Sequence, residues 1–348
     1  LLLEKLQETK INHAIAISKI NQRLDIEKLR ISPNLTNQVF ESIERLSKDL
    51  DLDEPPPISS NKRKCSICTW KNVCKSTSIS EGHLSEVSGL GGKRISMLKE
   101  IGINTLKDLA HSDPIKLKED LKHPHNIIAP QIINQALIQL NKTKKRLKPY
   151  PALPELNELK GVFLYDIESD PDSKHDFLHG FIRLSRMNNG EWNLEEANYQ
   201  PLLNLENNNE EFIWKRIKKK LAAHPSFPIL HYGETESIYI YKLAQRNKCT
   251  ESELNSIRNR FIDIHLRIKE NWLLPINNYS LKTVANYIGF HWEQKGVDGS
   301  NALLWWRQWK YSRRSRKLPS NNLKQIFQYN KDDCLATWAI ASWLIKNN

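Results

Sequence analysis

An apolar run that ends in two acidic residues is the feature that most constrains the fold of this chain. The run is Gly161-Val-Phe-Leu-Tyr-Asp-Ile-Glu-Ser-Asp170, in which Asp166 and Glu168 stand two positions apart. In a β-strand, that spacing puts both side chains on the same face. Two carboxylates so close repel one another unless a cation lies between them, and such oxygen ligands suit Mg²⁺ or Mn²⁺. The pattern therefore predicts a strand that carries a metal site.

A second acidic element lies near the end of the sequence. It reads Tyr329-Asn-Lys-Asp-Asp333 and leads into an apolar helical stretch at 335–344. Tyr329 and Asp333 are one helical turn apart, so they lie on one face of that helix. The strand and the helix together predict a divalent-metal centre.

From about residue 160 onward, strand and helix patterns alternate, which predicts an α/β domain. Residues 1 to about 60 read as helical, residues 80 to about 147 as short helices, and the Pro-rich stretch 148–154 as a linker. The strands expected after it are 162–167, 177–184 and 228–232. The helices expected there are 210–223, 236–245, 251–261, 280–288 and 321–346.

The balance of charge favours an anionic partner. The chain has 348 residues, of which 52 are Lys or Arg and 40 are Asp or Glu, giving a formal net charge of +12. Basic runs at 142–148, 215–220 and 313–317 each fit a solvated surface equally well when taken alone. Three such runs beside a carboxylate site favour nucleic acid as the partner.

Two classes of protein are disfavoured by the sequence. It has no apolar stretch of about eighteen residues, so we expect no membrane span. Its five cysteines, three of them clustered, do not resemble the disulfide framework of a secreted protein. We therefore expect a cytoplasmic location.

Residues 160–348 resemble the RNase H-like 3′–5′ exonucleases of the four-carboxylate type, including the YprB-like branch that is often found beside RecB-like nuclease modules. Asp166 and Glu168 match the first motif of that family, and Tyr329 and Asp333 match the last. The third acidic residue falls in Leu230-His-Tyr-Gly-Glu-Thr-Glu236, where the family usually has Asp. Glu236 is the first choice, because it begins the following helix, and Glu234 is the second.

The resemblance implies hydrolysis of phosphodiester bonds with two metal ions, Mg²⁺ or Mn²⁺, about 3.5–4 Å apart. Asp166, Glu168 and Asp333 would bind the metals, Glu236 would be a further catalytic residue, and Tyr329 would orient a water. The implied substrate is DNA degraded from a 3′ end in repair or recombination. The alternatives are a nucleic-acid-binding scaffold without activity and a ribonuclease of the same fold.

Three cysteines near the middle of the first half form a C-x₂-C-x₅-C cluster. They are Cys65, Cys68 and Cys74, and thiolates at this spacing bind a soft metal ion or an iron–sulfur cluster. The cluster resembles the C-terminal end of RecB-like nuclease modules with a [4Fe–4S] cluster, whose fourth Cys lies far upstream. No Cys precedes Cys65 here, so the resemblance implies a chain that begins within a longer protein. The alternative is a zinc site with His83 as the fourth ligand.

The stretch Val87-Ser-Gly-Leu-Gly-Gly-Lys-Arg94, with 98–109 after it, resembles a helix–hairpin–helix module. Glycines in such a turn let backbone N–H groups approach a DNA phosphate, and basic side chains add neutralising charge. These contacts bind nucleic acid without reading its sequence. The residues expected to make them are Gly89, Gly91, Gly92, Lys93 and Arg94.

The sequence thus predicts three parts. Residues 1–78 would be the end of a RecB-like nuclease module with the Cys cluster, 79–148 a helix–hairpin–helix segment and 155–348 an RNase H-like exonuclease domain. Trp305, Trp306 and Trp309 could stack bases in a single-strand channel, but their spacing also fits a helix half-buried in the core, which is favoured.

Overall fold

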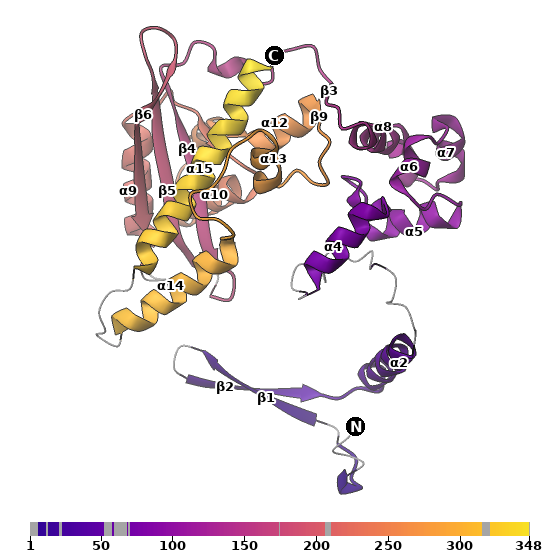
Figure 1. Ribbon diagram of the computed structural model, residues 1–348. Coiled ribbons are helices and arrows are strands. Elements are labelled where there is room, and N and C mark those ends of the chain that lie inside the picture. The colour runs from indigo at the N-terminus through magenta and orange to yellow at the C-terminus, as the bar shows by residue number, and fades with distance from the viewer. Residues whose placement is uncertain are drawn as a thin grey trace. The chain divides into compact units, whose positions relative to one another are not determined.

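The structure is a computed structural model (Figure 1). It describes residues 6–11, 13–20, 23–51, 58, 68, 70–173, 175–205, 210–314 and 321–347. The chain divides into two compact units, Leu1–Ser59 and Ser60–Asn348.

Among its described residues, the first unit contains a β-hairpin followed by a long helix. Strands β1 (His13–Ile20) and β2 (Arg23–Arg30) pair antiparallel, and α2 (Pro33–Leu50) follows. The prediction that residues 1 to about 60 are helical is therefore wrong for the hairpin. There, Ile15 and Ile17 stand two positions apart and are β-branched, and strands favour such residues. The helical prediction is confirmed for Pro33–Leu50, which form α2. Ser32 caps this helix, because its side chain accepts a hydrogen bond from the Leu35 N–H at 3.2 Å.

The second unit begins with a group of short helices around one apolar core. The core includes Leu84, Ile95, Leu98 and Leu109, all buried. The helices predicted between 80 and 147 are thereby confirmed. The elements are α4 (Lys71–Ser80), η1 (Leu84–Glu86), α5 (Gly92–Glu100), α6 (Leu106–Ala110), α7 (Pro114–Asp120), η2 (His125–Ile128) and α8 (Ala129–Leu140).

Direct contacts join this helical group to the rest of the second unit. The Gln135 side chain donates a hydrogen bond to the Leu274 carbonyl at 2.9 Å, and the buried position of that bond excludes water from it. Strand β3 (Lys145–Arg146) pairs antiparallel with β9 (Trp272–Leu273). The Pro-rich stretch expected to be a linker is packed, because Ala152 and Leu153 are buried in the core of the next domain.

A five-stranded sheet organises that domain, in the order β6-β5-β4-β7-β8. The first three strands pair antiparallel, and β7 and β8 run parallel to β4. The strands are β4 (Gly161–Asp170), β5 (His175–Arg186), β6 (Trp192–Leu203), β7 (Ile229–His231) and β8 (Phe261–Asp263). The helices are η3 (Pro154–Leu156), α9 (Glu210–Ala222), α10 (Thr235–Arg246), α11 (Glu251–Arg258), α12 (Ile264–Asn271), α13 (Leu281–Tyr287), α14 (Gly299–Arg314) and α15 (Asn322–Lys346).

Both faces of the sheet are covered, which explains the unbroken apolar run at the start of β4. Val162 and Leu164 pack into a core on one face, where α15 crosses the sheet (Figure 1). Phe163 and Tyr165 pack into a second core on the opposite face, against α9 and α10. A strand buried on both sides needs no polar alternation.

The α/β prediction is therefore confirmed, with local differences. Strand β6 and helix α12 were not predicted, and the helix expected at 251–261 ends at Arg258 so that Phe261 begins β8. The favoured core position of the tryptophans is confirmed: Trp306 is fully buried in α14 and stacks on Phe177 with ring centroids 4.5 Å apart. Within the part of the chain that the structure describes, no helix has both the length and the apolarity needed to span a membrane.

Candidate metal centre

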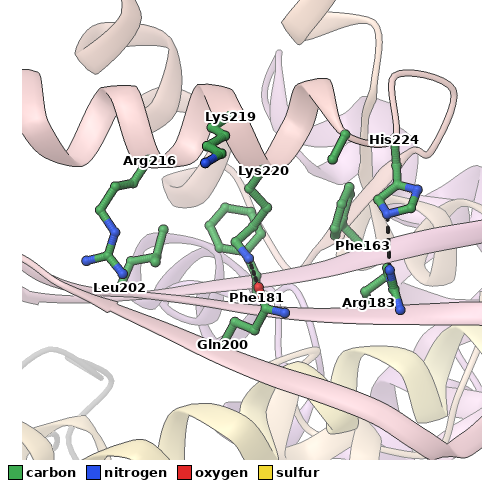
Figure 2. Close-up of a pocket in the computed structure, with 10 residues that line it drawn as sticks. Phe163, Phe181, Arg183, Gln200, Leu202, Arg216, Lys219, Lys220 and His224 are labelled. Carbon is green, nitrogen blue, oxygen red and sulfur yellow. Dashed lines mark hydrogen bonds between the residues drawn. The ribbon is translucent and has the colours of Figure 1, made fainter.

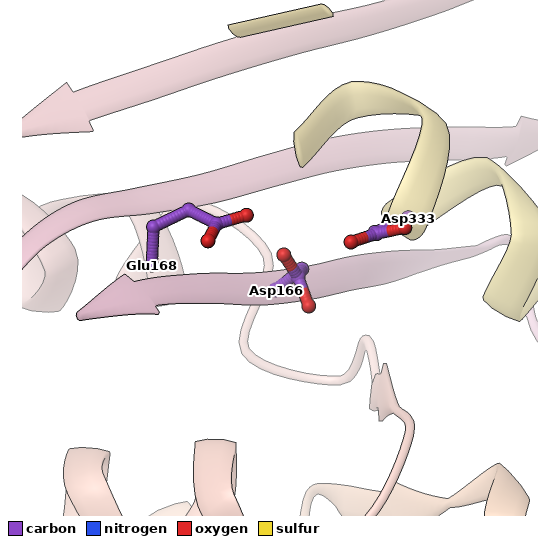
Figure 3. A group of neighbouring side chains, drawn as sticks. All are labelled: Asp166, Glu168 and Asp333. Carbon is purple, nitrogen blue, oxygen red and sulfur yellow. The ribbon is translucent and has the colours of Figure 1, made fainter. Parts of the chain in front are cut away.

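Three carboxylates, from two elements far apart in sequence, point toward one another on the α15 face of the sheet (Figure 3). Asp166 and Glu168 lie on β4, and Asp333 lies on α15. One carboxylate oxygen from each residue lies within 4.8 Å of the others. Of the residues described, no other group of three His, Cys, Asp or Glu side chains meets this criterion. The strand and the helix that the sequence singled out thus meet at one place.

The register of β4 and a close approach of α15 create this arrangement. Asp166 pairs with Gly180 of β5, and the Cys334 thiol of α15 lies 3.8 Å from the Gly180 carbonyl oxygen. A Cβ atom on residue 180 would lie 1.6 Å from the Asn330 Oδ1 atom. Glycine is therefore needed at this position for α15 to place Asn330 and Asp333 over the strand.

Asn330 links the helix to the carboxylates. It is fully buried, and its Nδ2 group donates a hydrogen bond to Asp166 Oδ2 at 2.6 Å. Its Oδ1 atom accepts a hydrogen bond from the Tyr199 hydroxyl of β6 at 2.9 Å. A hydrogen bond from Asn330 also opposes the rise that burial causes in the pKa of Glu168. One amide thus orients two of the three candidate ligands, although the sequence analysis did not single it out.

The two consecutive aspartates of α15 have different environments. Asp333 accepts a hydrogen bond from the Trp292 indole N–H at 2.7 Å and lies in the carboxylate group. Asp332 instead accepts hydrogen bonds from the Glu293 backbone N–H at 2.9 Å and from the Gln328 amide at 2.8 Å. Asp332 therefore fixes the loop after α13, whereas Asp333 is available to the site.

Burial and mutual repulsion make the three carboxylates hard to ionise. Burial raises the pKa of Asp166 well above its ordinary value, and the charges of Asp333 and Glu168 raise it further. The pKa of Glu168 is raised by the same causes, burial first and then the charge of Asp333. Burial raises the pKa of Asp333 to about 7, although the Trp292 hydrogen bond opposes the shift.

A hard divalent cation fits this donor set. Three carboxylates, those of Glu168 and Asp333 from buried residues and that of Asp166 from a half-buried one, attract positive charge. The charge of Lys282 already opposes the rise in the pKa of Glu168 and of Asp333. Oxygen ligands from carboxylates are those that Mg²⁺ and Mn²⁺ prefer. Binding such an ion would offset the repulsion that burial makes costly.

Tyr329 lies one turn before Asp333, as predicted, and is buried. A hydrogen bond from its hydroxyl lowers the pKa of Asp333. The Lys282 ammonium lies 5.0 Å from the centre of the Tyr329 ring. This arrangement fixes the Tyr329 hydroxyl beside Asp333.

Glu236 lies outside the three-carboxylate group. It is buried in the first turn of α10, and its charge raises the pKa of both Asp166 and Glu168. Its Oε2 atom is 3.7 Å from His231 Nδ1. Neither of these two atoms has a hydrogen-bond partner among the described residues. Glu234, the second choice, is exposed at the N-terminus of α10.

The glycine-rich turn of the helical group has an open surface. Gly89 has a φ of +85°, which favours glycine, and a Cβ atom at Gly89 or Gly91 would meet nothing within 4 Å. Gly92 begins α5, Lys93 is exposed, and Arg94 donates a hydrogen bond to the Gly89 carbonyl at 3.0 Å. The backbone of this turn is therefore accessible.

The cysteine cluster is only partly described. Cys65 lies outside the described residues, and Cys68 and Cys74 are free thiols. His83, the alternative zinc ligand, is buried, with Nδ1 at 2.9 Å from the Ser85 hydroxyl and Nε2 at 3.2 Å from the Lys99 ammonium. Both ring nitrogens thus contact other groups, which disfavours the zinc alternative.

Sequence reasoning missed the residues that orient the carboxylates. Three such residues are Asn330 and Trp292, which donate hydrogen bonds to the carboxylates, and Lys282, whose positive charge favours their ionised form. Their partners lie up to 164 positions away in sequence. Asn330 had one usable signal, its place inside the acidic element 329–333 of the expected helix. Trp292 had none.

We expect Asn330→Ala to lower the affinity for Mn²⁺ by about 10–100-fold, the usual effect of removing a group that orients metal ligands. The variant also leaves the half-buried Tyr199 hydroxyl without its acceptor, at a cost of about 1–3 kcal/mol in folding stability. Isothermal titration with Mn²⁺ measures the first effect and thermal unfolding the second. Tyr199→Phe is the control, because it keeps the amide on Asp166. Equal Mn²⁺ affinity in Asn330→Ala and the wild type would contradict the assigned role.

The comparisons with known proteins agree with this geometry. A family model described as the RNase_H superfamily matches residues 163–345. No curated protein and no solved structure matched the chain. The matched segment spans more than half of the chain and includes the sheet, α15 and the three carboxylates. The chain therefore belongs to the RNase H superfamily.

Proposed function

We propose that the chain is a divalent-metal-dependent nuclease that hydrolyses phosphodiester bonds of DNA as a 3′–5′ exonuclease. The observation that carries the proposal is the group formed by Asp166, Glu168 and Asp333, with an oxygen of each within 4.8 Å of the others. Membership of a superfamily of nuclease-type domains supports the reaction class. The preference for DNA, the 3′–5′ direction and a setting in repair or recombination rest on the resemblance to four-carboxylate exonucleases.

The proposed roles follow from the contacts of each side chain. Asp166, Glu168 and Asp333 would hold Mg²⁺ or Mn²⁺, which when bound lowers the pKa of water and neutralises charge on the phosphate. Asn330 and Trp292 hold the carboxylates in place. Tyr329, hydrogen-bonded to Asp333, orients the attacking water. Glu236 is proposed as a further catalytic residue, because it is buried and its charge raises the pKa of both Asp166 and Glu168.

Two other parts of the chain carry lesser proposals. The turn of Gly89, Gly91, Gly92, Lys93 and Arg94 would bind nucleic-acid phosphates through its accessible backbone, which the absence of side chains near Gly89 and Gly91 supports. Cys65, Cys68 and Cys74 would belong to an iron–sulfur site. Iron and sulfide in anaerobically purified protein would support that site, and zinc in their place would overturn it.

Digestion of a 5′-labelled single-stranded DNA, beside an RNA of the same sequence, tests the proposed function. With Mn²⁺ or Mg²⁺ we expect a ladder of DNA products that shorten from the 3′ end, and no products in EDTA. If only the RNA is digested, the chain is a ribonuclease and the proposal is wrong. If the chain binds the strands but digests neither, it is a nucleic-acid-binding scaffold without activity and the proposal is wrong.

A further inference from the structure

A cationic cavity lies between α9 and the strands β5 and β6 (Figure 2). Its volume is about 480 Å³. The floor is apolar, formed by Phe163, Phe181 and Leu202, and the rim is basic. The basic lining residues are Arg183, Arg216, Lys219, Lys220 and His224, and the lining contains no acidic residue.

The basic residues of α9 fall into two sets with different partners. Lys215 forms a salt bridge with Glu211 at 2.5 Å, and Lys218 forms one with Glu253 at 2.6 Å. Arg216 and Lys219, by contrast, line the cavity and have no salt bridge to a carboxylate in the described part of the chain. The two lysines outside the cavity, Lys215 and Lys218, are therefore neutralised by glutamates. The charges of Arg216 and Lys219 inside the cavity are not neutralised by a described carboxylate.

Internal contacts hold the rim in a fixed arrangement. The Arg183 guanidinium lies 3.2 Å from His224 Nε2, and Lys220 donates a hydrogen bond to the Gln200 side chain (Figure 2). Burial and the charges of Arg216 and Arg183 lower the pKa of Lys220, and burial and Arg183 lower that of His224. The cations thus destabilise one another, and an anion between them would remove that repulsion.

The cavity is separate from the metal centre. On β4, Phe163 faces the core under α9, whereas Asp166 faces α15. On β5, Phe181 and Arg183 line the cavity, whereas Gly180 lies against Asn330. Since alternate residues of a strand point to opposite faces, the sheet itself lies between the two sites.

We propose that this cavity binds phosphate groups, either of a free nucleotide or of a nucleic-acid strand. Two arginines offer the planar donor pairs that bind phosphate oxygens bidentately, and two lysines add point charge. A site with two arginines, two lysines, no acidic residue and an apolar floor matches a multiply charged phosphate ligand rather than a neutral one. The cavity would then hold a second phosphate-bearing ligand, independent of the metal centre.

Titration calorimetry of the full chain in EDTA tests the proposal without dependence on metal chemistry. The probes are pyrophosphate, thymidine monophosphate and a twelve-residue oligothymidylate. We compare Arg216→Ala/Lys219→Ala with Lys215→Ala/Lys218→Ala, because both pairs remove two charges from exposed positions of α9. Removing the cavity pair is expected to weaken binding about tenfold or more, and removing the other pair about twofold or less.

The three probes separate the two sources of phosphate. Binding of pyrophosphate and the monophosphate with this variant pattern assigns the cavity to a free nucleotide. Binding of the oligonucleotide alone, with the same pattern, assigns it to a strand. An equal loss in both double variants, or no binding of any probe by the wild type, overturns the proposal. Thermal unfolding confirms that each variant is folded.

Discussion

Asp333→Asn is expected to lower metal-dependent hydrolysis about 1000-fold, while Asp332→Asn retains activity within a few-fold of the wild type. The two residues are neighbours on α15, both buried, and both accept hydrogen bonds. Only Asp333 lies with Asp166 and Glu168. Loss of one ligand removes about 4 kcal/mol of transition-state stabilisation, and each 1.4 kcal/mol is a factor of ten in rate.

The amide substitution isolates the charge of the carboxylate. Asn at 333 keeps an oxygen that accepts the Trp292 hydrogen bond and keeps the side-chain volume. Single-turnover digestion of labelled DNA with Mn²⁺ measures the rate for both variants. Equal activity in Asp333→Asn and Asp332→Asn would contradict the assignment of Asp333. The Asp166→Asn variant should behave as Asp333→Asn does.

Without metal, the domain is expected to lose stability as pH rises from about 4 to about 7. The pKa of Asp333 is raised from 3.8 to about 7 by burial, so the folded state binds a proton that the unfolded chain has released in this window. Stability falls with pH wherever the folded state binds more protons. One pKa unit is worth about 1.4 kcal/mol, so this residue contributes at most about 4 kcal/mol. Asp166 shifts in the same direction.

Mn²⁺ should reverse this loss, because metal binding needs the ionised carboxylates. We expect Mn²⁺ to raise the melting temperature more at pH 8 than at pH 5, by about 2–4 °C for each kcal/mol gained. In EDTA at pH 8, Asp333→Asn should melt above the wild type. When Mn²⁺ is added in the absence of EDTA, the melting temperature of Asp333→Asn should not rise. Asp332→Asn serves as the control and should keep the Mn²⁺ effect. A Mn²⁺ effect that persists in Asp333→Asn would place the ion elsewhere.

The centre of the site could be predicted from the sequence, because its main signals are local. A strand fixes the shared face of Asp166 and Glu168, and a helical turn fixes that of Tyr329 and Asp333. Hydrophobic patterns also predicted β4, β5, β7 and several helices of the last domain, although not β6, β8 or α12. These signals were enough to associate β4 with α15.

The supporting contacts could not be predicted, because they join residues distant in sequence. The need for glycine at 180 arises only where Asn330 of α15 packs against β5. The different roles of Asp332 and Asp333 depend on Glu293 and Trp292, which lie in the loop after α13. The cationic cavity likewise depends on which Lys of α9 finds a carboxylate partner, as Lys218 does at Glu253.

Anomalous diffraction from crystals grown with Mn²⁺ tests the central claim most directly. We predict a Mn²⁺ peak bonded to oxygens of Asp166, Glu168 and Asp333, at carboxylate distances of about 2.0–2.3 Å. The same peak should be absent from crystals of Asp333→Asn. A fully occupied Mn²⁺ site elsewhere, with these three carboxylates free of metal, would contradict a metal-dependent nuclease centre at this place.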